Sequence, residues 1–225
     1  MHRGSCLDHL FTCPWFSLRC SSAKILVQME TTLTTNEIEQ RQKKGERGLL
    51  ALGIFSIVMI FAGLTSAYVV RRDGGEWFNL NMPDVFKVST ALILISSLTI
   101  NFAGWAFRKD KKQMGVLLLV ITLLLGLGFS LTQFLGWKEL TSNGVFFVSP
   151  DKQPALISGS FLYLFTGLHL VHLIGGVIAL FITTIKGAMG AYNSSNTHGV
   201  QLCSTYWHFL DGLWIYLFLF LTFFK

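Results

Sequence analysis

Charge is what this sequence has least of. Only 13% of its 225 residues are charged, whereas 52% are hydrophobic, and the mean hydropathy is +0.53. A soluble domain carries about 25% charged residues, so this composition excludes a soluble globular protein and indicates an integral membrane protein. The alternating pattern of a membrane β-barrel is also missing. The fold class predicted is therefore all-α, a polytopic bundle of membrane helices.

Motifs that would hold a cofactor or nucleotide are missing too. The sequence has no Cys-x-x-Cys, no Walker A pattern and no complete Gly-x-Gly-x-x-Gly, and Cys203 fits a small apolar packing position. The net charge of +6 does not indicate nucleic acid, because Lys and Arg gather at the ends of apolar runs without interleaved aromatic residues. These absences leave no basis for a thiol-held cofactor, a bound nucleotide or a nucleic-acid partner.

Five apolar stretches are long enough to cross the bilayer as helices. A helix needs about 20 apolar residues to span the hydrocarbon core, which is about 30 Å thick. The stretches that meet this length are 49–70, 86–107, 114–137, 155–185 and 201–224. We expect helix contacts at small residues spaced by four, which let helices approach closely in a membrane. These pairs are Ala62 and Ser66, Gly63 and Ala67, Gly126 and Ser130, and Gly175 and Ala179.

The distribution of Lys and Arg predicts an N-in, C-out orientation, because cytoplasmic loops carry an excess of these residues. In that orientation, nine of the Lys and Arg residues of 29–225 lie inside and six outside. The inside set is Arg41, Lys43, Lys44, Arg47, Arg108, Lys109, Lys111, Lys112 and Lys186, and the outside set is Arg71, Arg72, Lys87, Lys138, Lys152 and Lys225.

The sequence before the first apolar stretch divides into two parts. Residues 1–28 form a poor signal peptide, because Pro14 interrupts their only apolar patch and no clean apolar run precedes a cleavage site. Residues 29–48 form a polar leader on the cytoplasmic side, and 49–225 form the membrane domain. We predict Met29 as the biological start. The alternative is a genuine extension upstream of Met29, which a peptide containing Cys6 or Cys13 would reveal.

Three histidines fall within predicted membrane helices. His169 and His172 are three residues apart and so share one helix face. Such a pair can form half of a metal or proton site. The alternative, which we favour, is that both rings hydrogen-bond within the bundle, because the membrane region offers too few further ligands. Gln133 is a candidate for a hydrogen bond between helices.

Asp211 is the only carboxylate within the last apolar run, and His208 lies one helical turn before it. An unpartnered charge at this depth costs about 2.5–3.5 kcal/mol on insertion scales, so Asp211 is expected to face the bundle or a partner subunit. The spacing allows a direct hydrogen bond or ion pair between His208 and Asp211. The alternative is a buried polar clasp from these residues to another helix or another subunit.

Two stretches resemble signatures of cytochrome c oxidase subunit III. The first runs from Phe165 through His169 and His172 to Gly176. The second is Tyr206-Trp207-His208-Phe209-Leu210-Asp211 with Trp214. Further matches are Phe61-Ala62-Gly63, Ser96-Ser97 and Gln133. The resemblance covers 45–225 and is to the short, five-helix bacterial form.

This resemblance implies a non-redox subunit of the bacterial inner membrane that binds no haem or copper itself. It would pack mainly on subunit I, contact subunit II, other oxidase subunits and membrane lipids, and help proton uptake. Haem and copper would belong to partner subunits. No residue is implied as catalytic, cofactor-binding or metal-binding. Structural or subunit-interface roles are implied for His169, His172, Tyr206, Trp207, His208, Asp211, Trp214 and Gln133.

Two departures from the long form limit what can be carried over. Five helices replace seven, so a lipid-holding cleft built with the two missing helices is absent or is completed by another subunit. Ile57 stands where the long form has a membrane-embedded Glu, so no mechanism through that carboxylate is carried over.

Other readings remain open at this stage. Within the family, the chain fits a subunit III of a quinol oxidase or an accessory subunit of nitric oxide reductase, because the electron donor binds other chains. From other classes, a membrane di-iron oxygenase would use His169-x-x-His172 as part of a His box, and a transporter would use Asp211 to couple an ion. Too few histidines support the oxygenase, and no inverted repeat supports the transporter.

Overall fold

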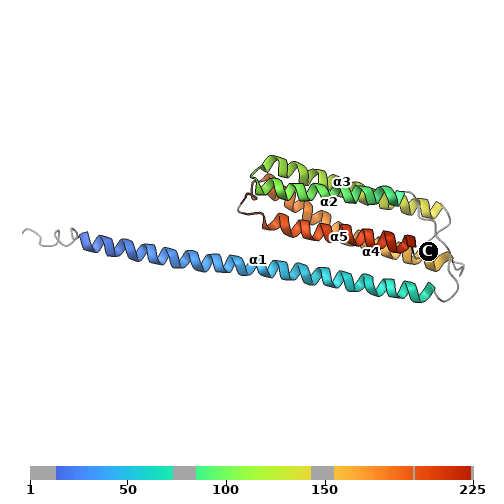
Figure 1. Cartoon of the computed structure of the whole chain (residues 1–225), viewed down its shortest axis with the longest axis horizontal. Helices are drawn as coiled ribbons and strands as arrows, with labels where there is room; N and C mark the ends of the chain where they lie inside the picture. Colours follow the sequence, from blue (N-terminus) through green and yellow to red (C-terminus); the bar gives the residue numbers. More distant parts are fainter. Residues whose placement is uncertain (1–13, 73–84, 143–154, 195, 224–225) are drawn as a thin grey trace, which may run out of the picture. The chain divides into compact units, whose positions relative to one another are not determined.

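A computed structural model describes 14–72, 85–142, 155–194 and 196–223, and it describes side chains within 37–72, 85–142, 159–194 and 196–223. The helices are α1 (Pro14–Arg72), α2 (Val85–Arg108), α3 (Lys112–Ser142), α4 (Ala155–Ala188) and α5 (His198–Phe223) (Figure 1). Each contains a segment long and apolar enough to cross a membrane. The all-α, five-helix prediction is therefore confirmed for the part of the chain that is described.

The helix ends differ from the sequence-based prediction mainly in α1 and α3. α1 continues well to the N-terminal side of the first predicted stretch, and α3 extends five residues beyond the third, to Ser142. Hydropathy marks only the membrane-depth part of a helix, so polar residues that continue the same helix are missed. Residue 224, the predicted end of the last stretch, lies outside the described residues.

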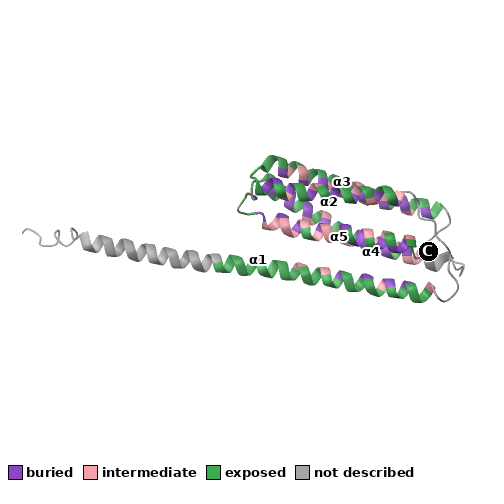
Figure 2. Ribbon diagram, in the orientation of Figure 1, coloured by how far each residue is buried: buried purple, intermediate pink, exposed green. Residues whose placement is uncertain are grey.

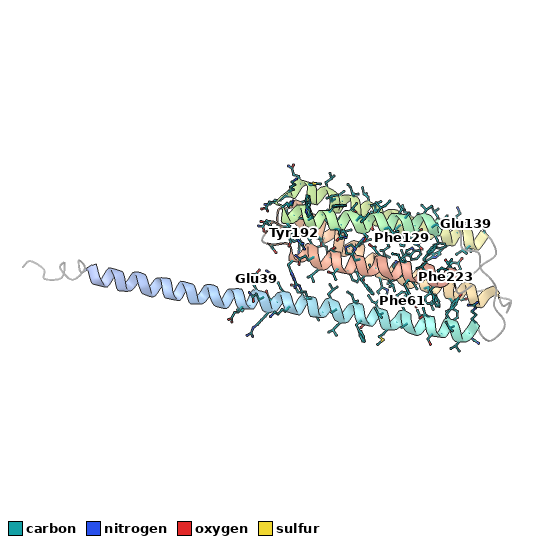
Figure 3. The ribbon with its side chains drawn as sticks, in the orientation of Figure 1. Glu39, Phe61, Phe129, Glu139, Tyr192 and Phe223 are labelled. Atoms are coloured by element: carbon teal, nitrogen blue, oxygen red, sulfur yellow. The ribbon has the colours of Figure 1, made fainter. Side chains whose placement is uncertain are left out.

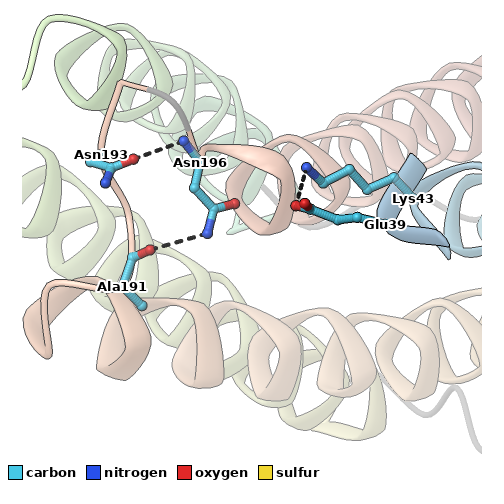
Figure 4. A network of polar contacts seen from close by, with 5 residues as sticks. All are labelled: Glu39, Lys43, Ala191, Asn193 and Asn196. Atoms are coloured by element: carbon cyan, nitrogen blue, oxygen red, sulfur yellow. Dashed lines mark hydrogen bonds and ion pairs between the residues drawn. The ribbon is translucent and has the colours of Figure 1, made fainter. Parts of the chain in front are cut away.

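The chain separates into two units, Met1–Leu49 and Leu50–Lys225. In the first unit, Lys43 Nζ lies 2.7 Å from Glu39 Oε1, one helical turn away (Figure 4). Glu39 is exposed and Lys43 is partly exposed, and such an i,i+4 pair contributes only about 0.3–0.5 kcal/mol. The side chains described in this unit, at 37–49, are therefore nearly all exposed.

In the second unit, α2 packs on α3 and α5, and α4 packs on α3 and α5. The main core cluster runs through these four helices and includes the fully buried Phe129 and Trp207. Figure 2 shows buried residues along all four. A second cluster joins α1 to α4 and α5 through aromatic side chains, chiefly Phe61, Tyr68 and Phe165. The second unit is thus a bundle whose core is shared by several helices.

The turns after α2 and α4 have the same construction. After α2, Asp110 adopts a left-handed φ of 56°, Lys111 N–H donates to Ala106 O at 3.0 Å, and Asp110 N–H donates to Phe107 O at 3.1 Å. Gly190, with φ of 79°, closes α4 in the same way. Both are Schellman motifs, which satisfy carbonyls at a helix end.

A hydrogen bond links these two turns. Ser194 N–H, in the segment between α4 and α5, donates to Asp110 Oδ1 at 2.9 Å. Because the carboxylate form accepts this bond, the pKa of Asp110 is lowered. Asn196 N–H donates to Asn193 Oδ1 at 2.8 Å, and Asn196 Nδ2–H donates to Ala191 O at 3.3 Å, which shapes the segment before α5 (Figure 4). The α2–α3 and α4–α5 connections therefore lie at the same end of the bundle.

Candidate functional site

Two tryptophans of α5 hydrogen-bond to hydroxyl groups of α2. Trp207 Nε1–H donates to Ser96 Oγ at 3.1 Å, and Trp214 Nε1–H donates to Thr90 Oγ1 at 3.1 Å. Both indoles are buried, so each bond satisfies a donor that would otherwise lack water. The bonds lie two helical turns apart along α5. They fix the register between α5 and α2, so both predicted residues act between helices.

Trp207 also fills a space beside α3. A Cβ placed on Gly126 would lie 2.6 Å from Trp207 Cη2, well inside van der Waals contact. Glycine is therefore the residue that lets the indole reach the α3 backbone. The predicted small pair of Gly126 and Ser130 thus marks a real close approach, whereas a Cβ on Gly63, in the α1 pair, would meet nothing within 4 Å.

His208 forms a clasp to α2 and not a pair with Asp211. Its Nε2–H donates to Asn101 Oδ1 at 3.0 Å, and its Nδ1 forms a hydrogen bond with Ser97 Oγ at 2.8 Å. Both imidazole nitrogens are thereby satisfied by α2. The direct hydrogen bond or ion pair between His208 and Asp211 that the spacing allowed is not formed, because the His208 ring is bonded to α2. The alternative of a clasp to another helix is correct for His208.

Asp211 lies inside the bundle with 3% of its surface exposed, as its cost in lipid required. Neither carboxyl oxygen has a hydrogen-bond partner among the described residues. Ser97 is close to this carboxyl, but its hydroxyl is hydrogen-bonded to His208. Asp211 is therefore a buried polar group without a partner in the described part of its own chain.

His169 and His172 of α4 have different surroundings although they share a helix face. His169 is completely buried, and its ring centroid lies 5.9 Å from that of Phe129 and 5.2 Å from that of Trp214. Figure 3 labels Phe129. His172 Nδ1–H donates to Leu168 O at 2.8 Å within its own helix. The structure thus gives His172 a hydrogen bond and surrounds His169 with aromatic rings.

Tyr206 connects α5 to α4 beside these histidines. Its hydroxyl donates to the main-chain carbonyl of His172 at 3.2 Å. A carbonyl that already serves the helix can accept a second bond, so this contact adds a link without removing one. Tyr206 thus ties α5 to α4 as Trp207 and Trp214 tie α5 to α2.

Gln133 of α3 is a third polar residue of the interior. It is fully buried, and its amide oxygen and nitrogen both lack a hydrogen-bond partner within the described ranges. The expected hydrogen bond from Gln133 to another helix is therefore not formed there. Gln133, His169 and Asp211 come from three different helices, and both nitrogens of His169 are also unpartnered in the described part of the chain.

A pocket that the sequence did not reveal lies between α2 and α5, near the end of α2. It has a volume of about 340 Å³ and is lined by Ile100, Asn101, Gly104, Trp105, Arg108, Thr197, Val200, Gln201, Ser204 and Thr205. Above the Trp105 ring, Lys109 Nζ lies 4.3 Å from the centroid. Asn101, a polar residue within an apolar run, was the signal that could have indicated this pocket.

Metal binding has little support in the described ranges. No group of three or more His, Cys, Asp or Glu side chains gathers there with metal-ligand geometry. His169 lies among aromatic rings rather than beside a second ligand. Among the described residues, no cluster of this size is available to hold a copper ion.

Residues 23–225 match the family described as cytochrome c oxidase subunit III. "Probable quinol oxidase subunit 3" of Staphylococcus saprophyticus is 28% identical over 193 residues, covering 81% of this chain and 92% of the relative. "Probable cytochrome c oxidase subunit 3" of Mycobacterium bovis is 32% identical over 169 residues, covering 72% and 80%. "Cytochrome c oxidase subunit 3" of Homo sapiens is 30% identical over 187 residues, covering 78% and 68%.

Proposed function

Because the chain belongs to the cytochrome c oxidase subunit III family, we propose that it is the non-redox subunit III of a bacterial haem–copper terminal oxidase. That complex would reduce oxygen to water and pump protons in aerobic respiration. The chain would support subunit I and proton uptake without a catalytic centre of its own. In this proposal, oxygen reduction takes place in partner subunits and this chain has a structural role.

One observation carries this proposal. The signature residues of α5 are used to join helices, since Trp207 and Trp214 bond α2 hydroxyls, His208 bonds Ser97 and Asn101, and Tyr206 bonds an α4 carbonyl. Residues directed into helix contacts are unavailable to a substrate. These contacts support structural roles for Tyr206, Trp207, His208 and Trp214. We propose structural or subunit-interface roles also for His169, His172, Asp211 and Gln133, of which His169, Asp211 and Gln133 are buried in the bundle.

The test is purification of the oxidase by a tag on this chain, followed by removal of the chain. We expect the tagged chain to carry haem- and copper-containing subunits, among them subunits I and II. Its removal should leave their haem and copper content intact and shorten the catalytic lifetime during turnover. Stoichiometric haem or copper in the chain purified alone would contradict the proposal.

A second candidate function is subunit III of a quinol oxidase, which the similarity to the staphylococcal protein favours. The two candidates differ in electron donor, which other chains bind. An absorption spectrum of the purified complex distinguishes them. A c-type haem or a dinuclear copper signal supports cytochrome c as donor, and oxidation of quinol without either signal supports the quinol oxidase. An accessory subunit of nitric oxide reductase would instead co-purify with nitric oxide reductase activity.

We further propose the bacterial inner membrane as the location, with the N-terminus inside and the C-terminus outside. The excess of Lys and Arg near Arg108 supports this orientation. Alkaline phosphatase fused after Lys225 should be active, whereas a fusion in the α2–α3 turn should be inactive. The reverse pattern would contradict the orientation.

The domain limits are part of the same proposal: a leader at 1–28 absent from the mature protein, a polar leader at 29–48 and a membrane domain at 49–225. Mass spectrometry of the intact subunit checks the first limit. A mass that begins at Met29 supports it, and a mass that includes Cys6 contradicts it.

A further inference from the structure

The exposed surface of the bundle differs from one pair of helices to the other. At membrane depth on α3 and α4, the exposed side chains are aliphatic or aromatic, apart from Gly175. They are Leu117, Val120, Ile121, Leu124, Leu127, Leu131, Phe134, Leu135, Leu164, Val171, Ile174, Ile178, Phe181, Ile182 and Ile185. This surface suits contact with lipid acyl chains.

The groove between α2 and α5 has the opposite character. On α2 the residues along it are Ser97, Asn101, Gly104 and Arg108, and on α5 they are Gln201, Ser204, Thr205, His208 and Gly212. All are at least partly exposed, and spacings of three and four residues place each set along one face of its helix. We name this surface the α2–α5 groove. It is a stripe of polar and small residues, whereas the most exposed residues at membrane depth on α3 and α4 are apolar apart from Gly175.

Two polar side chains of the groove lie well inside their helices and not at the helix ends. Asn101 is about 10 Å along α2 from its last residue, Arg108, and His208 is about 15 Å along α5 from its first residue, His198. Among the described residues, the Asn101 amide nitrogen makes no hydrogen bond, since only its oxygen is used, by His208. A donor left open towards acyl chains is unfavourable, so this groove is unsuited to lipid.

Shape and charge add to this argument. A Cβ on Gly104 or on Gly212 would meet nothing within 4 Å, so both glycines leave room for a helix backbone to approach closely. At the end of the groove, Arg108 makes no ion pair within the described ranges, and Lys109 and Lys111 lie over Trp105. The nearby carboxylate of Asp110 is bonded to Ser194. The groove therefore ends in positive charge without a matching acid.

We propose that the α2–α5 groove seats a transmembrane helix of another oxidase subunit. That helix brings a hydrogen-bond acceptor to the level of the Asn101 amide nitrogen and a carboxylate to Arg108. Its small residues or side-chain knobs fit against Gly104 and Gly212, and a side chain enters the pocket of about 340 Å³. This inference rests on the proposed function, because it names the face through which the chain joins the complex.

The test uses a photoreactive benzoylphenylalanine in the tagged full-length chain, in native membranes that contain the whole complex. One variant carries it at Thr205, which is exposed in the pocket, and the control carries it at Val171, which is 63% exposed on the apolar α4 surface. Mass spectrometry then identifies each adduct. We expect Thr205 to capture a polypeptide of another subunit and Val171 to capture lipid. Lipid alone at Thr205, or subunit adducts at Val171 only, would overturn the proposal.

A second pair of variants measures assembly. Gly104→Leu fills the groove, and Gly128→Leu places the same side chain on α3, where a Cβ also meets nothing within 4 Å. We expect Gly104→Leu to abolish co-purification of oxidase subunits with this chain and Gly128→Leu to leave it unchanged. Equal co-purification in both variants would contradict the binding of a partner helix in the α2–α5 groove. If the unmodified chain carries no oxidase subunits, the proposed function itself fails, which separates the two outcomes.

Discussion

The seam between α2 and α5 and the interior shared by α3, α4 and α5 treat polar side chains in opposite ways. In the seam, Trp207, His208 and Trp214 each bond a side chain of α2. In the interior, Gln133, His169 and Asp211 are buried, yet they have no side-chain hydrogen bond in the described part of the chain. The three seam residues thus bond α5 to α2, whereas the three interior residues depend on water or another subunit for a partner, or remain unsatisfied.

The largest expected effect comes from removing the centre of the seam. Trp207→Ala deletes an indole packed on Gly126 and the bond to Ser96, so we expect a loss of about 3–5 kcal/mol. Trp207→Phe keeps most of the volume and should lose about 1 kcal/mol, the value of one hydrogen bond. Thermal unfolding of the purified complex measures both. Equal losses in the two variants would show that packing on α3 contributes little.

An intermediate effect is expected at His208. His208→Leu leaves the Ser97 hydroxyl and the Asn101 amide without their partner, which costs about 1–3 kcal/mol. The control is the triple change His208→Leu, Ser97→Ala and Asn101→Leu, which removes the orphaned groups with the ring. We expect the triple variant to recover part of the loss in the same unfolding assay. No recovery would mean that the bonds to α2 are not the source of the effect.

A smaller effect is expected at Asp211, the interior counterpart of His208. Because Asp211 has no partner in the described residues, Asp211→Leu breaks no known bond and removes a costly buried polar group. The folded chain should be as stable as the unmodified chain or slightly more stable. The yield and the unfolding temperature of the chain expressed alone measure this. Loss of assembly with other subunits, in a chain that still folds, would identify a partner group outside this chain. Asp211→Asn serves as the isosteric control.

The smallest effect is expected at the exposed Asp110, where the pKa is lowered by the hydrogen bond from Ser194 N–H. Because the pKa of Asp110 is lower in the folded chain than its unfolded value of about 3.9, its ionised form stabilises the fold at pH values above about 3.9. This stabilisation is lost as the pH falls through the folded-state pKa. We expect Ser194 amide exchange with deuterium, corrected for its intrinsic pH dependence, to be protected near pH 6 and less protected near pH 3. Asp110→Asn should remove this pH dependence, and its persistence would assign it elsewhere.

The number and type of helices could be predicted from sequence because hydropathy over about 20 residues determines membrane insertion. The pairing of side chains could not. Trp207 was a candidate residue and Ser96 only part of a family match, and it is the packing of α5 on α2 that brings the two side chains together. His208 shows the limit of local spacing, since a partner one turn away was available and the ring is directed to Asn101 and Ser97 instead. The pocket could not be predicted, because the residues that line it come from segments about 100 residues apart in the sequence.

The aromatic contacts of α1 have a consequence for how the chain is made. Phe61 stacks on Phe165 of α4, with ring centroids 6.5 Å apart, and Tyr68 meets Phe220 of α5 at 5.1 Å. Synthesis runs from the N-terminus, so the membrane segment of α1 leaves the ribosome before these partners exist. Phe61 and Tyr68 therefore lie against lipid until α4 arrives with Phe161 and Phe165, and Tyr68 meets Phe220 only once α5 follows. A truncation that omits α5 should therefore leave part of the Tyr68 ring exposed to proteins that bind unassembled membrane segments.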